Sequence, residues 1–81
     1  MRVASCQCGA VTAACSGEPV RISVCHCLEC QRRSGSAFAT QARFAAAAVV
    51  TSGETAIWQR RGDEGGVTSF HFCTRCGSSV W

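Results

Sequence analysis

Three of the chain's eight cysteines lie within six residues, in the stretch Cys25-His26-Cys27-Leu28-Glu29-Cys30. On an extended segment Cys25 and Cys27 point to one face and His26 points to the other. Cys27 and Cys30 have the C-x-x-C spacing at which a tight turn brings two sulfurs onto one metal ion. A strand that ends in such a turn can present three thiolates to one point. Because catalytic zinc sites have three protein ligands and a vacant fourth position, the stretch predicts an open tris-thiolate zinc centre.

Two further pairs of cysteines lie near the two ends of the chain. Cys6 and Cys8 are two residues apart and share one face of an extended segment. Cys73 and Cys76 form a C-x-x-C zinc knuckle, and the Gly77 that follows permits the positive φ of such a turn. Each pair supplies two ligands and needs two more. Joined across the chain, the two pairs would form a closed Cys₄ zinc site of the structural kind.

A different arrangement would join Cys27 and Cys30 to Cys73 and Cys76 as one zinc ribbon. Against it, 42 residues separate the two C-x-x-C pairs, whereas a ribbon has about 15–20 residues there. This arrangement would also leave Cys25 and the N-terminal pair without a site. The spacing therefore favours two separate zinc sites.

The remaining thiol and the start of the chain bear on the cellular compartment. Cys15 follows small residues on a predicted strand and is most simply a buried hydrophobe, with a ligand or redox role as the alternative. The chain starts without the apolar segment that signals secretion, and no stretch approaches the ~20 apolar residues of a membrane span. We therefore expect a cytoplasmic protein, not a membrane protein, whose reduced thiols bind metal instead of forming disulfides.

Length and charge limit the domain organisation and the partners. The 81 residues suffice for one domain, residues 1–81, whose core needs support from metal or disulfides. The formal charge of +3 comes from eight arginines and no lysine. Seven thiolates contribute −7 and two Zn²⁺ contribute +4, so the zinc-loaded protein would be about neutral. Without a basic field to attract phosphates, we expect no nucleic-acid partner.

Short predicted strands bounded by Gly, Ser and Thr dominate the pattern, which indicates a mainly β domain of short antiparallel strands. The strands are expected at residues 3–6, 10–16, 21–25, 37–42, 47–51, 56–61, 67–73 and 79–81. Turns are expected at 17–19, 52–54 and 62–66, and the single helical candidate is 28–33. The aromatic residues are core candidates first and pocket walls second: Phe38, Phe44, Trp58, Phe70, Phe72 and Trp81.

These motifs, taken in order, resemble the glutathione-dependent formaldehyde-activating enzyme family, which includes the centromere protein V relatives. The resemblance runs from SCQCGAV at 5–11 through GEP at 17–19 and CHCLECQRRSGS at 25–36. It continues through GE at 53–54 to FCTRCGS at 72–78. It implies a zinc-stabilised β-tent fold. Members commonly continue for tens of residues past the C-x-x-C-G segment, so this sequence is either a compact member or lacks a C-terminal part that helps to wall the pocket. It also implies two zinc ions per chain, a structural one on Cys6, Cys8, Cys73 and Cys76 and a catalytic one on Cys25, Cys27 and Cys30.

The function that the resemblance implies is a carbon–sulfur lyase. The founding activity of the family adds glutathione to formaldehyde and forms S-hydroxymethylglutathione, so the expected partners are a glutathione-like thiol and a small aldehyde. Zinc would act by deprotonating the thiol or by polarising the carbonyl oxygen. The alternatives are a non-catalytic zinc-stabilised binding module, as the centromere-associated relatives suggest, and metal storage or sensing. Three thiols apart from a complete Cys₄ set favour the enzyme, because a module that needs only stability would close both sites.

The candidate substrate-binding residues lie in and directly after the central cysteine stretch. Arg32 and Arg33 could clamp a glutathione carboxylate, or else be solvated or neutralise the thiolates. The amides of Ser34, Gly35 and Ser36 could form an anion-binding nest. His26 is a proton donor near the site or a packed residue on the reverse face, which strand alternation favours. Glu29 is an acid/base or temporary ligand, or an exposed turn residue, and His71 is expected to be structural.

Overall fold

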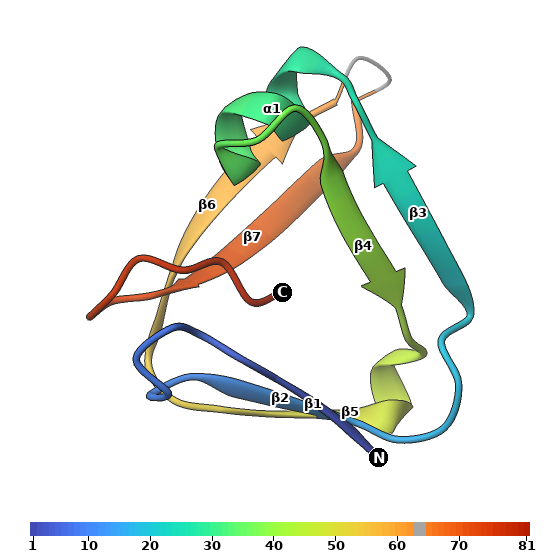
Figure 1. Ribbon diagram of the computed structural model, residues 1–81, viewed down its shortest axis with the longest axis vertical. Coiled ribbons are helices and arrows are strands. Elements are labelled where there is room, and N and C mark those ends of the chain that lie inside the picture. Colours follow the sequence, from blue (N-terminus) through green and yellow to red (C-terminus); the bar gives the residue numbers. More distant parts are fainter. Residues whose placement is uncertain (63–64) are drawn as a thin grey trace.

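The computed structural model describes residues 1–62 and 65–81, and its regular structure consists mainly of short strands (Figure 1). The strands are β1 (Arg2–Ser5), β2 (Thr12–Cys15), β3 (Arg21–Cys25), β4 (Ala39–Arg43), β5 (Val49–Ser52), β6 (Thr55–Arg61) and β7 (Val67–Cys73). The helix α1 (Leu28–Ser34) follows β3, and the 3₁₀ turn η1 (Ala46–Ala48) precedes β5. Every strand pair in these residues is antiparallel. The predicted class, mainly β with short antiparallel strands, is confirmed.

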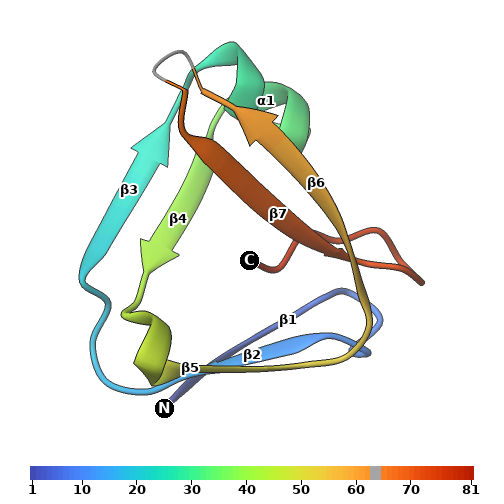
Figure 2. The same cartoon turned by 180° about the vertical axis from the view of Figure 1, so that it is seen from behind.

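The strands form three small sheets, which are the three sides of a triangular body (Figures 1 and 2). One sheet has the order β1-β2-β5, and the other two are the pairs β3-β4 and β6-β7. The helix α1 lies at the corner between the two-stranded sheets, since it contacts β4 and forms an ion pair with β6 through Glu29 and Arg60. In the described part of the chain, no helix is long and apolar enough to cross a membrane.

The buried core is small and is built around cysteines. Val11 and Cys73 are 0% and 1% exposed, and together with Cys6 they form the central cluster. The expectation that the aromatic residues form the core was wrong for most of them: within the described residues none is fully buried, and of the six only Trp81 packs, partly buried, against the central cluster. Phe38 and Trp58, for example, are 43% and 52% exposed. Phe44, Phe70 and Trp81 line a cavity between the sheets.

Two predicted strands differ from the structure for physical reasons. The alanine run expected to start a strand at 47 forms η1 instead, and the strand begins at Val49. Alanine has the highest helix propensity and offers little side chain to pack on a sheet. The strand expected at 79–81 is reduced to a bridge between Ser79 and Phe72. Hydrogen bonds from the His71 amide to the Trp81 carbonyl (2.6 Å) and from the Val80 amide to His71 (3.0 Å) still tie this segment to β7.

The other boundaries agree with the sequence to within a few residues. The helical segment is confirmed as α1, which Cys27 caps at the start and Gly35, with φ of 68°, at the end. The strand expected from residue 10 begins at Thr12, because residues 6–11 form the turn between β1 and β2. The turn expected at 62–66 includes residues 63 and 64, which lie outside the described residues.

Gly53 lies where the turn between β5 and β6 passes close to the turn between β1 and β2. Its φ is +102°, and a Cβ would collide with the Ala10 carbonyl oxygen and lie 2.9 Å from Val11 Cα. We expect Gly53→Ala to destabilise the protein by about 2–4 kcal/mol, from backbone strain plus a steric clash. Gly17→Ala is the control: φ there is +74° with nothing within 4 Å, so strain alone should cost about 1–2 kcal/mol. Equal urea midpoints for the two variants would contradict the clash.

Candidate metal centres

The first thiol group joins the two ends of the described chain. The sulfurs of Cys6, Cys8, Cys73 and Cys76 all lie within 4.8 Å of one another. The first pair lies in the turn between β1 and β2, which closes through a hydrogen bond from the Cys6 amide to Val11 (3.0 Å). The second pair lies at the end of β7. This pairing was inferred from the spacing, and the structure brings it together instead of the ribbon arrangement.

The sulfur–sulfur distances in this group match those of a tetrahedral zinc site. Cys8 Sγ lies 3.6 Å from Cys6 Sγ and 3.7 Å from Cys73 Sγ, whereas a disulfide bond is about 2.05 Å long. Four sulfurs placed about 2.3 Å from one Zn²⁺ at tetrahedral angles are about 3.8 Å apart. The amide of Val11 donates to Cys6 Sγ (3.3 Å) and that of Arg75 to Cys73 Sγ (3.3 Å). Amide donors stabilise thiolates, so the residues present fit a soft divalent metal such as zinc.

The pKa values within this group are shifted in opposite directions, which favours thiolate at one cysteine and thiol at another. Hydrogen bonds from the Ser78 hydroxyl and then the Ser78 amide lower the pKa of Cys76 to about 5. For Cys8, the Ala10 amide favours the thiolate, yet the neighbouring Cys6 and other cysteines together raise its pKa to about 11. Thiols this close cannot all ionise, because like charges repel. A bound divalent cation would remove that conflict and allow four thiolates.

The second thiol group lies where β3 leads into α1. The sulfurs of Cys25, Cys27 and Cys30 lie within 4.8 Å of one another, and within the described residues no fourth His, Cys, Asp or Glu joins them. Cys25 ends β3, Cys27 caps α1, and Cys30 lies in the first turn of α1. Cys30 is buried, Cys25 is half-buried and Cys27 is exposed. The group is therefore covered by protein on one side and open to solvent at Cys27.

Hydrogen bonding also favours a thiolate in the second group. The Cys30 amide donates to Cys27 Sγ at 3.4 Å. This bond, followed by the bond with the Cys25 thiol, lowers the pKa of Cys27 to about 7. The same neighbours, Cys25 first and then Cys27, raise the pKa of Cys30. One thiolate is thus favoured without metal, and three would again require a cation.

The residues after the second group separate into two faces of α1. Arg32 forms an ion pair with Glu29 (3.3 Å), and Glu29 also approaches Arg60 (4.0 Å). Glu29 is therefore occupied by arginines on the exposed face and is not part of the thiol group. Arg33 lies on the other side, with its guanidinium carbon 4.8 Å from the centre of the Phe70 ring.

The expected anion-binding nest is already occupied by hydrogen bonds within the chain. The Gly35 amide donates to the Gln31 carbonyl (3.0 Å), and the Ser36 amide donates to Ser34 Oγ (3.2 Å). Ser34 Oγ in turn donates to the Phe38 carbonyl (3.1 Å). These groups close the end of α1, which leaves the Gly35 and Ser36 amides no free proton for an anion.

The remaining chemically active side chains lie outside both groups. His26 is exposed, with its ring centre 5.6 Å from that of Phe38. His71 has its Nδ1 3.3 Å from Thr55 Oγ1 and its ring stacked at 5.0 Å on Trp81. Cys15 is 9% exposed and belongs to neither group. The burial expected for Cys15 is confirmed.

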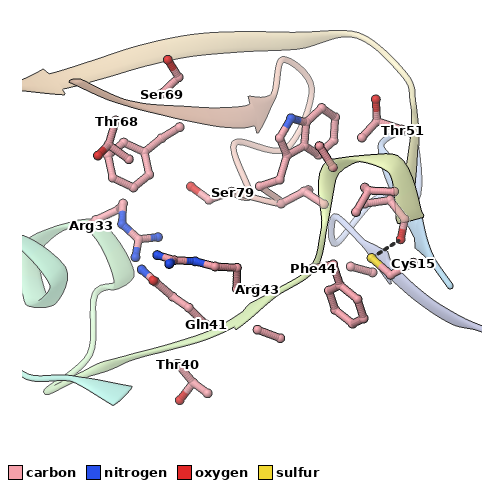
Figure 3. Close-up of a pocket in the computed structure, with 18 residues that line it drawn as sticks. Cys15, Arg33, Thr40, Gln41, Arg43, Phe44, Thr51, Thr68, Ser69 and Ser79 are labelled. Atoms are coloured by element: carbon pink, nitrogen blue, oxygen red, sulfur yellow. Dashed lines mark hydrogen bonds between the residues drawn. The ribbon is translucent and has the colours of Figure 1, made fainter. Parts of the chain in front are cut away.

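A cavity of about 740 Å³ lies between the three sheets (Figure 3). Residues of β2, β4, β5 and β7 line it, together with Arg33, Phe44 and the segment 79–81. Sequence reasoning did not assign Gln41 or Arg43 to any site, because polar residues on a short strand are normally solvated. The available signal was strand alternation, which places both residues on the face of Ala39, the partner of Cys25.

Comparison with known proteins identifies the family. Among individual curated proteins no match is found. A family model described as glutathione-dependent formaldehyde-activating enzyme matches residues 1–81. The match spans both thiol groups and the cavity between the sheets. The chain therefore belongs to the glutathione-dependent formaldehyde-activating enzyme family.

Proposed function

We propose that this protein is a zinc-dependent carbon–sulfur lyase that adds a thiol such as glutathione to formaldehyde or a related small aldehyde. The observation that carries the proposal is the group of three converging thiols, Cys25, Cys27 and Cys30, which is open to solvent at Cys27. The family match supports the substrate class. The four-thiol group at the other corner would hold a second, structural zinc, which leaves the three-thiol group free for chemistry.

The chain's own residues would provide a rigid, half-open site. The pairing of Cys25 with Ala39 fixes the end of β3, and the cap from Cys27 fixes the start of α1, so the three sulfurs come from two elements held in place. When bound there, zinc would supply a Lewis acid that favours the substrate thiolate. The substrate sulfur then adds to the carbonyl carbon, so that one C–S bond forms as the C=O π bond breaks, and the carbonyl oxygen takes up the proton that the thiol loses. The addition is redox-neutral and reversible.

Among the candidate substrate-binding residues, the surroundings favour Arg33. Its guanidinium faces the cavity and the Phe70 ring, whereas Arg32 is paired with Glu29. Ser34 and Gly35 would act indirectly, by closing α1 and so fixing Arg33. His26 lies against Phe38, which favours packing over proton donation. We therefore assign the glutathione carboxylate to Arg33.

The test is the rate at which S-hydroxymethylglutathione forms. We expect the zinc-loaded protein to accelerate exchange between ¹³C-formaldehyde, glutathione and the adduct, measured by NMR exchange spectroscopy, above the spontaneous rate. Arg61→Gln is the control, because Arg61 lies outside both thiol groups and outside the cavity lining and the variant should keep the acceleration. A rate equal to the spontaneous one, with two zinc ions bound, would reject the lyase and leave the non-catalytic binding module.

A further inference from the structure

The cavity between the sheets has a positively charged lining, and none of the cysteines of the two thiol groups belongs to this lining. Its described lining includes Arg33 from α1 and Arg43 from β4, and no aspartate or glutamate. In Figure 3 these two guanidinium groups and the Gln41 amide point toward one another. Like charges that converge in a partly enclosed space repel, and an anion between them removes the repulsion.

Arg33 is held in place while its N–H groups remain available. Its guanidinium lies over the Phe70 ring at 4.8 Å, a cation–π contact that orients the group but uses none of its five donors. The Phe70 ring is itself stacked on Trp58 at 5.9 Å. Within residues 1–62 and 65–81, Arg33 and Arg43 form no ion pair, whereas Arg2, Arg32 and Arg60 each do.

The strand register connects this charge to the three-thiol group. Cys25 is paired with Ala39 on β4, and Ala39, Gln41 and Arg43 share one face of that strand. At about 3.4 Å per residue, Gln41 lies about 7 Å and Arg43 about 14 Å along β4 from the level of Cys25. On α1, Arg33 is three residues after Cys30 and therefore lies on the same face of the helix. Both elements thus lead from the thiol group into the cavity.

We propose that Arg33, Gln41 and Arg43 form a carboxylate-binding subsite for the far end of the thiol substrate. The inference rests on the proposed function in that the substrate sulfur is taken to lie at the three-thiol group. A carboxylate has about four acceptor positions, which the two guanidinium groups and the Gln41 amide can fill between them. The separation of about 7–14 Å corresponds to an extended peptide of about two to four residues. The subsite therefore selects peptide thiols with a free carboxylate and rejects short thiols such as 2-mercaptoethanol.

The experiment measures binding without chemistry at sulfur. S-methylglutathione retains both carboxylates, but its sulfur is capped and is a poor metal ligand. We expect it to bind the zinc-loaded protein in isothermal titration calorimetry, and its diethyl ester to bind about tenfold more weakly or not at all. Arg33→Gln and Arg43→Gln should each raise the Kd by about tenfold. Arg61→Gln, which removes the same charge outside the cavity lining, should leave the Kd unchanged.

Each outcome supports or overturns the subsite separately from the lyase. If Arg43→Gln and Arg61→Gln weaken the binding of S-methylglutathione equally, the ligand is attracted only by the net charge of the protein, and the subsite is overturned. Failure of S-methylglutathione to bind would also overturn it, even if the NMR exchange assay shows acceleration. Binding that is lost in Arg43→Gln, in a protein without acceleration, supports the subsite and rejects the lyase. If Arg43→Gln fails to fold, as judged by circular dichroism and zinc content, Arg43→Lys keeps the charge but should still lose the paired hydrogen bonds and weaken binding.

Discussion

Cys73→Ser is expected to unfold the chain and release its structural metal. Cys73 is 1% exposed, lies in the central core cluster with Cys6 and Val11, and belongs to the four-thiol group. Structural zinc supplies roughly 10–16 kcal/mol of apparent binding free energy in small zinc domains, whereas the free energy of unfolding of a whole domain is about 5–15 kcal/mol. A core this small cannot compensate for the loss of the metal. We therefore expect the loss of the β-sheet circular dichroism and of dispersed NMR signals.

Cys15→Ser is the matched control for this variant. Cys15 is also buried, but its sulfur belongs to neither thiol group. The substitution buries a hydroxyl in place of a thiol and should cost about 1–3 kcal/mol, with two metal ions retained by mass spectrometry under native conditions. A Cys73→Ser protein that stays folded with two metal ions would contradict the structural role of the four-thiol group.

The grouping of the cysteines could be predicted from the sequence because it depends on short spacings. Residues two or three apart are brought together by a strand end or a turn, whatever the rest of the fold does. The contact between the pair Cys6 and Cys8 and the pair Cys73 and Cys76 is long-range. The sequence favours it over a zinc ribbon because too many residues separate Cys30 from Cys73. Loop length was sufficient to choose this pairing, because only a few ways of dividing seven thiols between two metal sites leave no thiol without a site.

The cavity could not be predicted because it depends on the angles between three sheets. Phe70 and Trp81 are core candidates in the sequence, and both line the cavity, although Trp81 also packs against the core cluster. No local sequence pattern predicts whether a large side chain on a short strand packs against another sheet or lines a cavity. Arg43 was not assigned to a site for the same reason. Its side chain lines a cavity only because β7 and Arg33 of α1 line the same cavity in the folded protein.

The choice between Arg32 and Arg33 shows what helix geometry could have added. Side chains three residues apart share a face of a helix. Arg33 therefore shares a helix face with the buried Cys30, and Arg32 shares one with Glu29, with which it forms an ion pair. The helical period, applied to the candidate helix at 28–33, separates the two arginines.

Cys27→Ser is expected to remove one metal ion, abolish the rate acceleration and leave the fold intact. Cys27 caps α1, with its sulfur accepting a hydrogen bond from the Cys30 amide. Serine is among the preferred N-cap residues, so its hydroxyl can accept the same bond and the helix should lose less than about 1 kcal/mol. What is lost is one of three sulfur ligands, because a neutral hydroxyl is a poor ligand for zinc compared with a thiolate.

The variant separates the two metal sites, because the four-thiol group lies elsewhere and keeps all its ligands. Native mass spectrometry should count two zinc ions in the wild type and one in Cys27→Ser, and a mild chelator should bring the wild type to the same state. Cys27→Ala is the companion variant: it should lose the same metal ion and, in addition, about 1 kcal/mol of stability from the missing cap. A Cys27→Ser protein that retains two zinc ions and the full exchange rate would place the chemistry outside the three-thiol group. A variant with one zinc ion and full acceleration would place it outside as well, since only the open site is predicted to lose its metal.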